Sequence, residues 1–73
     1  MDILQLGKLC KKVRLNKGIP LVTFAKINND NYKNIWAFEN GNANNIKYLS
    51  YYYNLFEDTQ KLEEFIKQVF EIL

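Results

Sequence analysis

Residues 24–41 read FAKINNDNYKNIWAFENG and carry the clearest structural signal in this chain. A cluster of polar residues at 28–31 marks a turn in the middle of this segment. Asn28 or Asn29 suits a backbone with positive φ, and Asn31 suits the N-cap of a following helix. The segment therefore predicts a turn that leads directly into a helix.

Two short helices are expected on either side of this turn. The first covers about residues 20–26, because proline is tolerated in the first turn of a helix, where its missing N–H would be unpaired anyway. The second covers about residues 32–40, with Ile35 and Phe38 facing inward and Gly41 ending it. The connection of about four residues has the length of a helix-turn-helix, although short turns also join helices in ordinary bundles.

Helical periodicity predicts three further helices, so the expected fold class is all-α. The segment before Gly18 carries on one face Leu6, Leu9, Cys10 and Val13. A helix at about residues 45–56 carries on one side Ile46, Leu49, Tyr53 and Phe56. A last helix begins at Asp58 or Thr59, and its apolar stripe is Leu62, Phe65, Ile66, Val69, Phe70 and Leu73. Residues 1–73 are therefore expected to form one compact domain of five helices.

Composition excludes several classes of catalytic and metal site. The chain has no histidine and one cysteine, Cys10, which excludes a histidine-based triad, a zinc finger and an intramolecular disulfide. Cys10 is expected in the core without a base to activate it, and Glu63 and Glu64 lie on a solvated helix face. We therefore expect no enzyme, no cofactor and no metal site.

Neither a membrane span nor a targeting segment is indicated. The longest uncharged stretch, Tyr48 to Phe56, is much shorter than the roughly 20 apolar residues of a spanning helix. Residues 1–14 lack the leading basic region and the cleavage site that are typical of a signal peptide. A cytoplasmic location is therefore the expectation.

Charge is uneven along the chain, although the formal net charge is only +2. Residues 1–47 carry eight basic and three acidic side chains, a net of +5. Residues 48–73 carry two basic and five acidic side chains, a net of −3. A basic front and an acidic back suit a polyanion bound on one face, although small domains often show such an imbalance by chance.

Three short patterns carry a family resemblance. They are Arg14-x-x-Lys17-Gly18-Ile19, Phe24-Ala25 and Ile35-x-x-Phe38-Glu39-Asn40-Gly41. Through them, residues 6–56 resemble the Cro/lambda-repressor-like helix-turn-helix family, also called the XRE family. The resemblance implies a five-helix lambda-repressor-like domain whose second and third helices form the helix-turn-helix, with residues 58–73 as a C-terminal amphipathic helix. It also implies a partly buried structural ion pair between Arg14 and Glu39.

Two segments depart from the family pattern. Pro20-Leu21 stand where the family usually has Ser-Gln, so a helix cap and a contact to DNA are lost. Asn28-Asn29-Asp30 stand where the family's turn reads Leu-Gly-Val, so two positions that usually lie in the core are polar here. These departures affect the DNA contacts and the turn more than the fold.

The resemblance implies a DNA-binding transcriptional regulator, of the kind that phages and mobile elements encode, acting in a bacterial cell or a phage-infected host. Its third helix would read the major groove of double-stranded DNA. Lys33 suits guanine O6 or N7 or a phosphate, and Asn34 suits an adenine edge. By family position, this surface comprises Asn31, Tyr32, Lys33, Asn34, Trp36 and Ala37. Flanking contacts are expected from Lys26, Asn40 and Asn42.

An alternative function is the binding of a protein by a repurposed helix-turn-helix. Tyr32 and Trp36 stand four residues apart and form one aromatic ridge, and exposed aromatic residues often anchor protein partners. Such a chain would act as an antirepressor, as a modulator of a larger repressor or as an inhibitor of a host factor. An antitoxin or a subunit of a larger complex stays open as a third class. A purely structural interpretation packs Trp36 over the turn.

A homodimer is a further expectation, because specific regulators usually bind two half-sites about one helical turn apart. The last helix is either a wall of the monomer core or a dimer interface. Tyr48 and Tyr52 share a face that either this helix or another subunit covers. The residues expected at a partner or dimer surface are Tyr48, Tyr52, Phe65, Val69, Phe70 and Leu73.

Overall fold

The computed structural model describes residues 2–73, and this part of the chain is helical, with no β-strand among these residues. Its elements are α1 (Ile3–Asn16), α2 (Leu21–Ile27), α3 (Tyr32–Glu39), the 3-10 turn η1 (Ile46–Tyr48), α4 (Leu49–Tyr53) and α5 (Thr59–Ile72). The prediction of an all-α chain with five α-helical segments is therefore confirmed for the described residues. Among residues 2–73 no helix has the length and the apolar character needed to cross a membrane.

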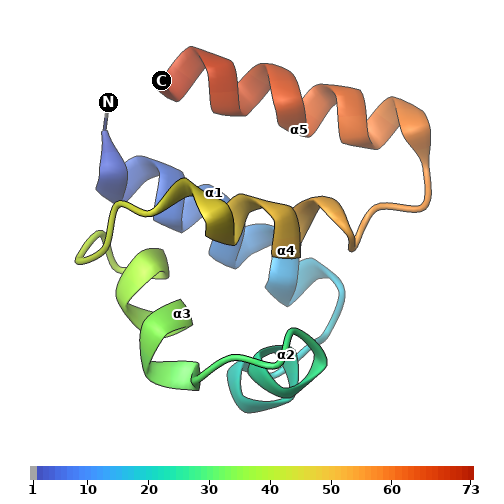
Figure 1. Ribbon diagram of the computed structural model, residues 1–73. Helices are drawn as coiled ribbons and strands as arrows, with labels where there is room; N and C mark the ends of the chain where they lie inside the picture. The colour runs from blue at the N-terminus through green and yellow to red at the C-terminus, as the bar shows by residue number, and fades with distance from the viewer. Residues whose placement is uncertain (1) are drawn as a thin grey trace.

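The helices are arranged around α1 (Figure 1). α5 lies on one side of α1, while α2 and α3 lie on the opposite side, and α4 packs against α1 between them. The start of α1 and the end of α5 lie at the same end of the molecule. This arrangement leaves α2 and α3 remote from α5.

Side-chain caps begin α3 and α5. Asn31 begins α3, because its side-chain oxygen accepts a 2.9 Å hydrogen bond from the backbone N–H of Lys33. Asp58 begins α5 in the same way, with a 2.9 Å bond from the N–H of Gln60. Each bond satisfies a backbone donor that the helix itself leaves unpaired, and both caps agree with the sequence prediction. α2 begins after Pro20 without a side-chain cap.

The ends of α1, α2 and α3 share one motif. Each is followed by a residue with positive φ, namely Gly18 (69°), Asn29 (52°) and Gly41 (76°). After α2, the N–H of Asp30 donates to the carbonyl of Ala25 over 2.9 Å, which closes the helix end as a Schellman motif. The equivalent bonds after α1 and α3 join Ile19 to Arg14 (3.3 Å) and Asn42 to Ala37 (2.8 Å). Asn29 thus takes the left-handed conformation that the turn cluster predicts.

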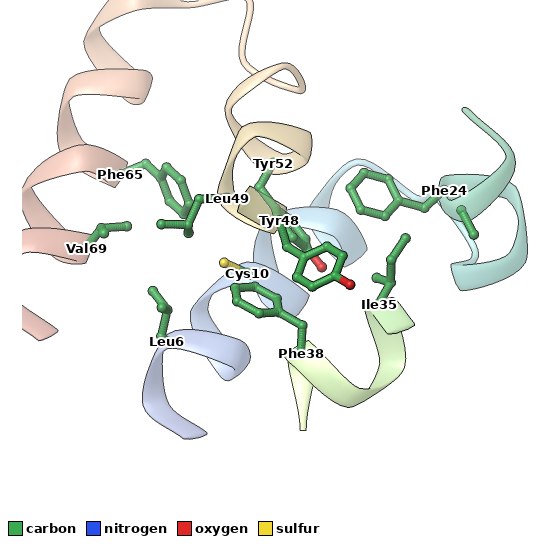
Figure 2. Packing of buried hydrophobic residues seen from close by; sticks show 11 residues of the cluster. Leu6, Cys10, Phe24, Ile35, Phe38, Tyr48, Leu49, Tyr52, Phe65 and Val69 are labelled. Atoms are coloured by element: carbon green, nitrogen blue, oxygen red, sulfur yellow. The ribbon is translucent and has the colours of Figure 1, made fainter. Parts of the chain in front are cut away.

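All five α-helices contribute to a single cluster of buried hydrophobic side chains (Figure 2). Ile35 and Phe38 point inward from α3, as predicted, and Cys10 is fully buried on α1. The Tyr52 ring lies 4.9 Å from that of Phe24 and 6.0 Å from that of Phe38, measured between centroids. The Tyr52 ring therefore packs against residues of both α2 and α3.

The inward face of the fourth predicted helix differs from the prediction. Ile46 is exposed, and Tyr53 and Phe56 are only partly buried, whereas Tyr48 and Tyr52 lie in the core. The segment begins as a 3-10 turn, η1, which has about three residues per turn. Leu49 is buried as predicted, but the tighter winding of η1 departs from the α-helical period, and the other buried positions are Tyr48 and Tyr52. The helix is also shorter than predicted, because α4 ends at Tyr53.

Candidate functional site

The candidate site is the outer face of α3, which we define as Tyr32, Lys33, Asn34 and Trp36. These four side chains are exposed, and the capping residue Asn31 beside them is exposed as well. The opposite face of α3 is buried and consists of Ile35, Phe38 and Glu39. Ala37 is half-buried at the border between the two faces. α3 is therefore held from one side and open on the other.

The position of α3 depends on a close approach to α1 at Gly7. Gly7 is buried, and a Cβ atom placed on it would overlap the backbone carbonyl oxygens of Phe38 and Glu39. The last turn of α3 thus contacts the α1 backbone directly. Gly41 makes a second close approach, because a Cβ on it would lie 2.9 Å from Cα of Leu4. Sequence reasoning assigned no such role to Gly7.

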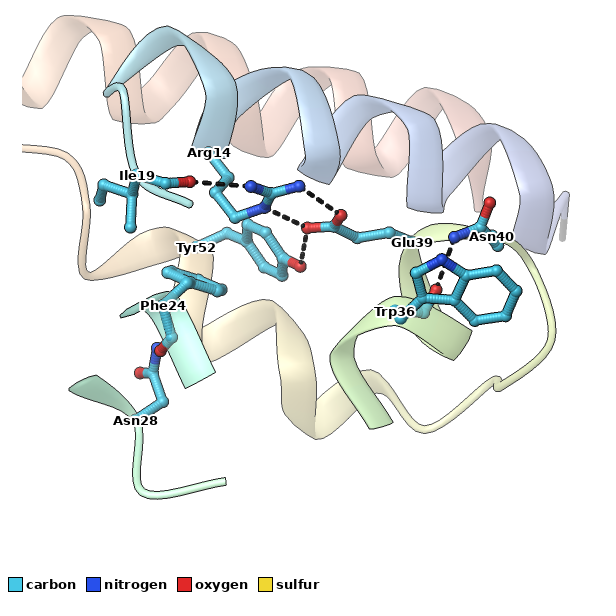
Figure 3. Close-up of polar contacts among 8 residues, drawn as sticks. All are labelled: Arg14, Ile19, Phe24, Asn28, Trp36, Glu39, Asn40 and Tyr52. Carbon is cyan, nitrogen blue, oxygen red and sulfur yellow. Dashed lines mark hydrogen bonds and ion pairs between the residues drawn. The ribbon is translucent and has the colours of Figure 1, made fainter. Parts of the chain in front are cut away.

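A buried ion pair fixes the same end of α3 (Figure 3). Arg14 donates from Nε to Oε2 of Glu39 and from Nη2 to Oε1, both over 2.9 Å. The hydroxyl of Tyr52 donates to Oε2 of Glu39 over 2.8 Å, and Nη1 of Arg14 donates to the carbonyl of Ile19 over 2.8 Å. This network, defined by Arg14, Glu39, Tyr52 and Ile19, connects four parts of the chain. They are α1, α3, α4 and the end of the loop between α1 and α2.

The network raises the pKa values of two of its side chains, Arg14 and Tyr52. Hydrogen bonding to Glu39 raises the pKa of Arg14, which stays charged. Burial, with a smaller contribution from the negative charge of Glu39, raises the pKa of Tyr52, so its hydroxyl remains a donor. Burial likewise raises the pKa of Cys10 to about 12. Cys10 is therefore a protonated core thiol, which fits its expected role and gives it no nucleophilic character at neutral pH.

The asparagines near α3 hydrogen-bond within the chain. The amide nitrogen of Asn40 donates to the carbonyl of Trp36 over 2.8 Å (Figure 3). That of Asn28 donates to the carbonyl of Phe24 over 2.9 Å. Both carbonyls also accept a backbone N–H bond, from Asn40 and Asn28 respectively, so each side chain adds a second bond near the end of its helix. Asn40, expected at a phosphate, thus also caps α3, while Asn42 beyond it is exposed.

Asp30 and Tyr51 form a polar cluster that the sequence does not predict. The hydroxyl of Tyr51 donates to Oδ2 of Asp30 over 2.7 Å. Oδ1 of Asp30 accepts from the side-chain nitrogen of Asn34 over 3.1 Å and from the backbone N–H of Asn31 over 2.6 Å. These bonds, chiefly the one from Tyr51, lower the pKa of Asp30. The same bond, which Tyr51 donates to Asp30, raises the pKa of Tyr51 to about 12. No local motif relates Tyr51 to Asp30, because the two residues are 21 positions apart in the chain.

The aromatic ridge of α3 is open to solvent. Tyr32 is 46% exposed and Trp36 is 51% exposed, so the interpretation of Trp36 as a residue packed away over the turn is wrong. Val22 on α2 is also 51% exposed, and it lines a shallow groove together with Tyr32. Lys26 and Asp30 line the same groove. The apolar surface next to α3 therefore extends onto α2.

Basic side chains are divided between two regions. Lys26 and Lys33 are exposed on α2 and α3, near the candidate site. Lys8 and Lys12 instead line a groove between α1 and α5. Glu64 and Glu71 of α5 line this groove as well, together with Lys61. Some of the basic side chains of residues 1–47 therefore lie beside acidic side chains of α5, away from α3.

Most of the residues expected at a partner or dimer surface lie in the core instead. Tyr48, Tyr52, Phe65 and Val69 are all at most 7% exposed, because α4 and α5 pack onto the rest of the chain. Their assignment to a surface is therefore wrong. Phe70 is 71% exposed and Leu73 is 50% exposed, so these two remain open. α5 serves as a wall of the core and presents an apolar edge outside it.

Comparisons with known proteins add no relative from which a role could be transferred. No protein-family model matches the chain, and no curated protein and no solved structure matches it significantly. Within residues 2–73, no group of three or more His, Cys, Asp or Glu side chains is placed to hold a metal ion. The outer face of α3 and its neighbours on α2 are the basis for a functional proposal.

Proposed function

We propose that this chain is a small DNA-binding transcriptional regulator of the Cro/repressor-like helix-turn-helix type, as phages and mobile elements encode. In this proposal α2, the connection at residues 28–31 and α3 are the helix-turn-helix, and α3 enters the major groove. The observation that carries the proposal is the division of α3 into a fixed inner face and an exposed outer face. Such a division suits a helix that must present side chains to a rigid ligand.

Polar side chains at the start of α3 supply the contacts that base edges need. Lys33 is exposed and carries three N–H donors, which suit guanine O6 and N7 or a phosphate. Asn34 is exposed and offers both a donor and an acceptor to adenine. Lys26 on α2 and Asn42 after α3 are exposed and would contact phosphates in this proposal, which would set the register on the duplex. Occupancy of an operator would then block or redirect transcription.

The first experiment is a selection from random duplex DNA with the purified chain at near-physiological salt. We expect one enriched sequence motif, and we expect the doubly substituted control Lys33→Ala/Asn34→Ala to lose it. Lys33→Ala alone should weaken binding and reduce the slope of log affinity against log salt by about 1, because one phosphate or base contact is lost. Circular dichroism would verify that the variants keep their helices. A folded wild-type chain that enriches no motif would contradict the proposal.

A second candidate function is the binding of a protein at the same face. It is favoured by the exposed apolar surface of Val22, Tyr32 and Trp36, because bulky aromatic side chains more often anchor proteins than read polar base edges. Trp36→Ala separates the two candidates. Loss of a protein complex with DNA binding retained would favour the protein partner, and loss of sequence-specific DNA binding would favour the regulator.

Dimerisation would suit a regulator of this size, since one small module buries little DNA surface. The exposed edge of α5 at Phe70 and Leu73 is the part of the proposed dimer surface that the fold leaves open. Phe70→Glu should keep the chain monomeric without loss of helicity, as measured by sedimentation over a wide range of protein concentrations. Gln68→Glu adds the same charge on another side of α5 and should leave association unchanged. Equal association of the wild type and Phe70→Glu would exclude this edge of α5 as the dimer interface.

A further inference from the structure

Asp30 stands at the junction between the turn and the outer face of α3. Its Oδ2 atom accepts from the hydroxyl of Tyr51, and its Oδ1 atom accepts from the side-chain nitrogen of Asn34. Tyr51 is itself positioned by two aromatic contacts, to the rings of Phe24 at 6.4 Å and Tyr48 at 5.7 Å. Asp30 is therefore held by Tyr51, which packs against the core, and it contacts Asn34 on the exposed face of α3.

An ionised carboxylate can only accept hydrogen bonds, so this contact determines which way the Asn34 amide is turned. The NH2 group of Asn34 must face Asp30, and its oxygen must face away from it. The NH2 group has two hydrogens, of which Asp30 takes one. Asn34 therefore keeps one N–H donor and its oxygen acceptor for another ligand.

One donor next to one acceptor is the pattern that the adenine edge requires in the major groove, where N7 accepts and the N6 amino group donates. Guanine presents two acceptors there, N7 and O6, and an asparagine that rotates freely can offer its two N–H donors to them. An amide whose NH2 group is already bonded to Asp30 has only one donor left. Fixing the amide therefore favours adenine over guanine.

We propose that Asp30, braced by Tyr51, is a positioning residue that fixes the Asn34 amide and makes position 34 selective for adenine. Asp30 has this role only if the chain binds DNA as proposed above, so the inference rests on that function. Asp30 carries a negative charge close to a surface that would meet phosphates. Its removal should thus leave overall DNA affinity undiminished while base selectivity falls.

The test measures binding to the selected duplex and to a variant duplex in which the adenine read by Asn34 is replaced by guanine. The wild type should prefer adenine by about tenfold, and Asn34→Ala should abolish the preference. Asp30→Ala should reduce it to less than about threefold with no loss of overall affinity, and Tyr51→Phe should reduce it partly. Lys33→Ala should weaken binding to both duplexes without changing their ratio.

Tyr53→Phe is the matched control for Tyr51→Phe, since within residues 2–73 the Tyr53 hydroxyl has no hydrogen bond to a side chain or to the backbone. Tyr51→Phe also keeps both ring contacts and the net charge, so it tests the inference even if Asp30→Ala does not fold. A wild type that selects no sequence would overturn both the DNA-binding proposal and this one. A wild-type preference for adenine that Asn34→Ala removes and that Asp30→Ala and Tyr51→Phe leave intact would overturn the role of Asp30 alone.

Discussion

At residue 7 the backbone of α1 lies so close to the end of α3 that no side chain fits between them. The obstructing atoms are the backbone carbonyl oxygens of Phe38 and Glu39, which cannot move aside as a flexible side chain can. Glycine is therefore required at this position by packing, although it lowers helix propensity inside α1 by about 1 kcal/mol relative to alanine.

Gly7→Ala should lower the free energy of unfolding by about 2 kcal/mol, because the added methyl group forces α1 and α3 apart and this cost exceeds the gain in helix propensity. Urea denaturation followed by circular dichroism measures the change. Lys11→Ala, an exposed substitution on the same helix, should stay within about 0.5 kcal/mol of the wild type. If Gly7→Ala proved as stable as Lys11→Ala, the close approach would be wrong.

Cys10 should resist thiol reagents in the folded protein up to strongly alkaline pH. Its pKa is raised to about 12, so the thiolate that reacts is scarce, and the side chain is fully buried. The raised pKa contributes stability that is complete below about pH 9 and is lost as the pH rises toward 12, since the unfolded chain ionises first. Alkylation followed by mass spectrometry should detect modification in urea at pH 8 but not in native buffer. Rapid native alkylation would place Cys10 outside the core.

At the scale of the helices, the same C-terminal motif closes α1, α2 and α3. Two of these ends use glycine, and the end of α2 uses Asn29. Asparagine tolerates the left-handed region better than other residues with a side chain, yet less well than glycine. The end of α2 therefore keeps the backbone motif of the ends of α1 and α3, with asparagine at the position that glycine takes in the other two.

Asn29→Gly should raise the free energy of unfolding by up to about 1 kcal/mol, and Asn29→Ala should lower it by about the same amount. The reason is the φ of 52° at this position, which glycine adopts without strain. Thermal or urea unfolding of the two variants beside the wild type gives the order directly. An alanine variant more stable than the glycine variant would contradict a left-handed residue at this point.

The local parts of the fold are predictable, and the distant contacts are not. Periodicity and capping residues predict α3, its cap at Asn31 and the positive φ in the turn, because these depend on neighbours in the sequence. The 3-10 turn η1 is missed, because it breaks the period from which the inner face is assigned. The bond from Tyr51 to Asp30 spans 21 positions, and no spacing rule relates two such residues. The apolar pattern of α3 predicts which of its residues are buried. It does not predict how Asp30 turns the amide of Asn34.

At the scale of the whole molecule, Arg14 and Glu39 unite helices that are far apart in the sequence. The pair spans 25 positions, and both side chains are almost completely buried. Within the described residues, no buried side-chain nitrogen or oxygen lacks a hydrogen-bond partner. A complete network of this kind favours the observed arrangement of helices, because an arrangement that separated Arg14 from Glu39 would leave a buried charge unpaired.

Arg14→Met and Glu39→Leu should each lower the free energy of unfolding by about 3–5 kcal/mol, because each leaves its partner buried without a counter-charge. The double variant Arg14→Met/Glu39→Leu should lose less than the sum of the two, since no charge is left unpaired. A double-mutant cycle in urea measures the difference. Strict additivity would show that the two charges do not interact.

The division of α3 has a consequence for how this chain can evolve. In the proposed function, recognition and folding fall to different residues of one eight-residue helix, so a change in one does not require a compensating change in the other. Mutations at the exposed residues Tyr32, Lys33 and Trp36 should change the proposed binding surface while the helix stays folded and correctly placed. A chain with the proposed function could therefore gain a new specificity by single substitutions on this face, each starting from a stable protein.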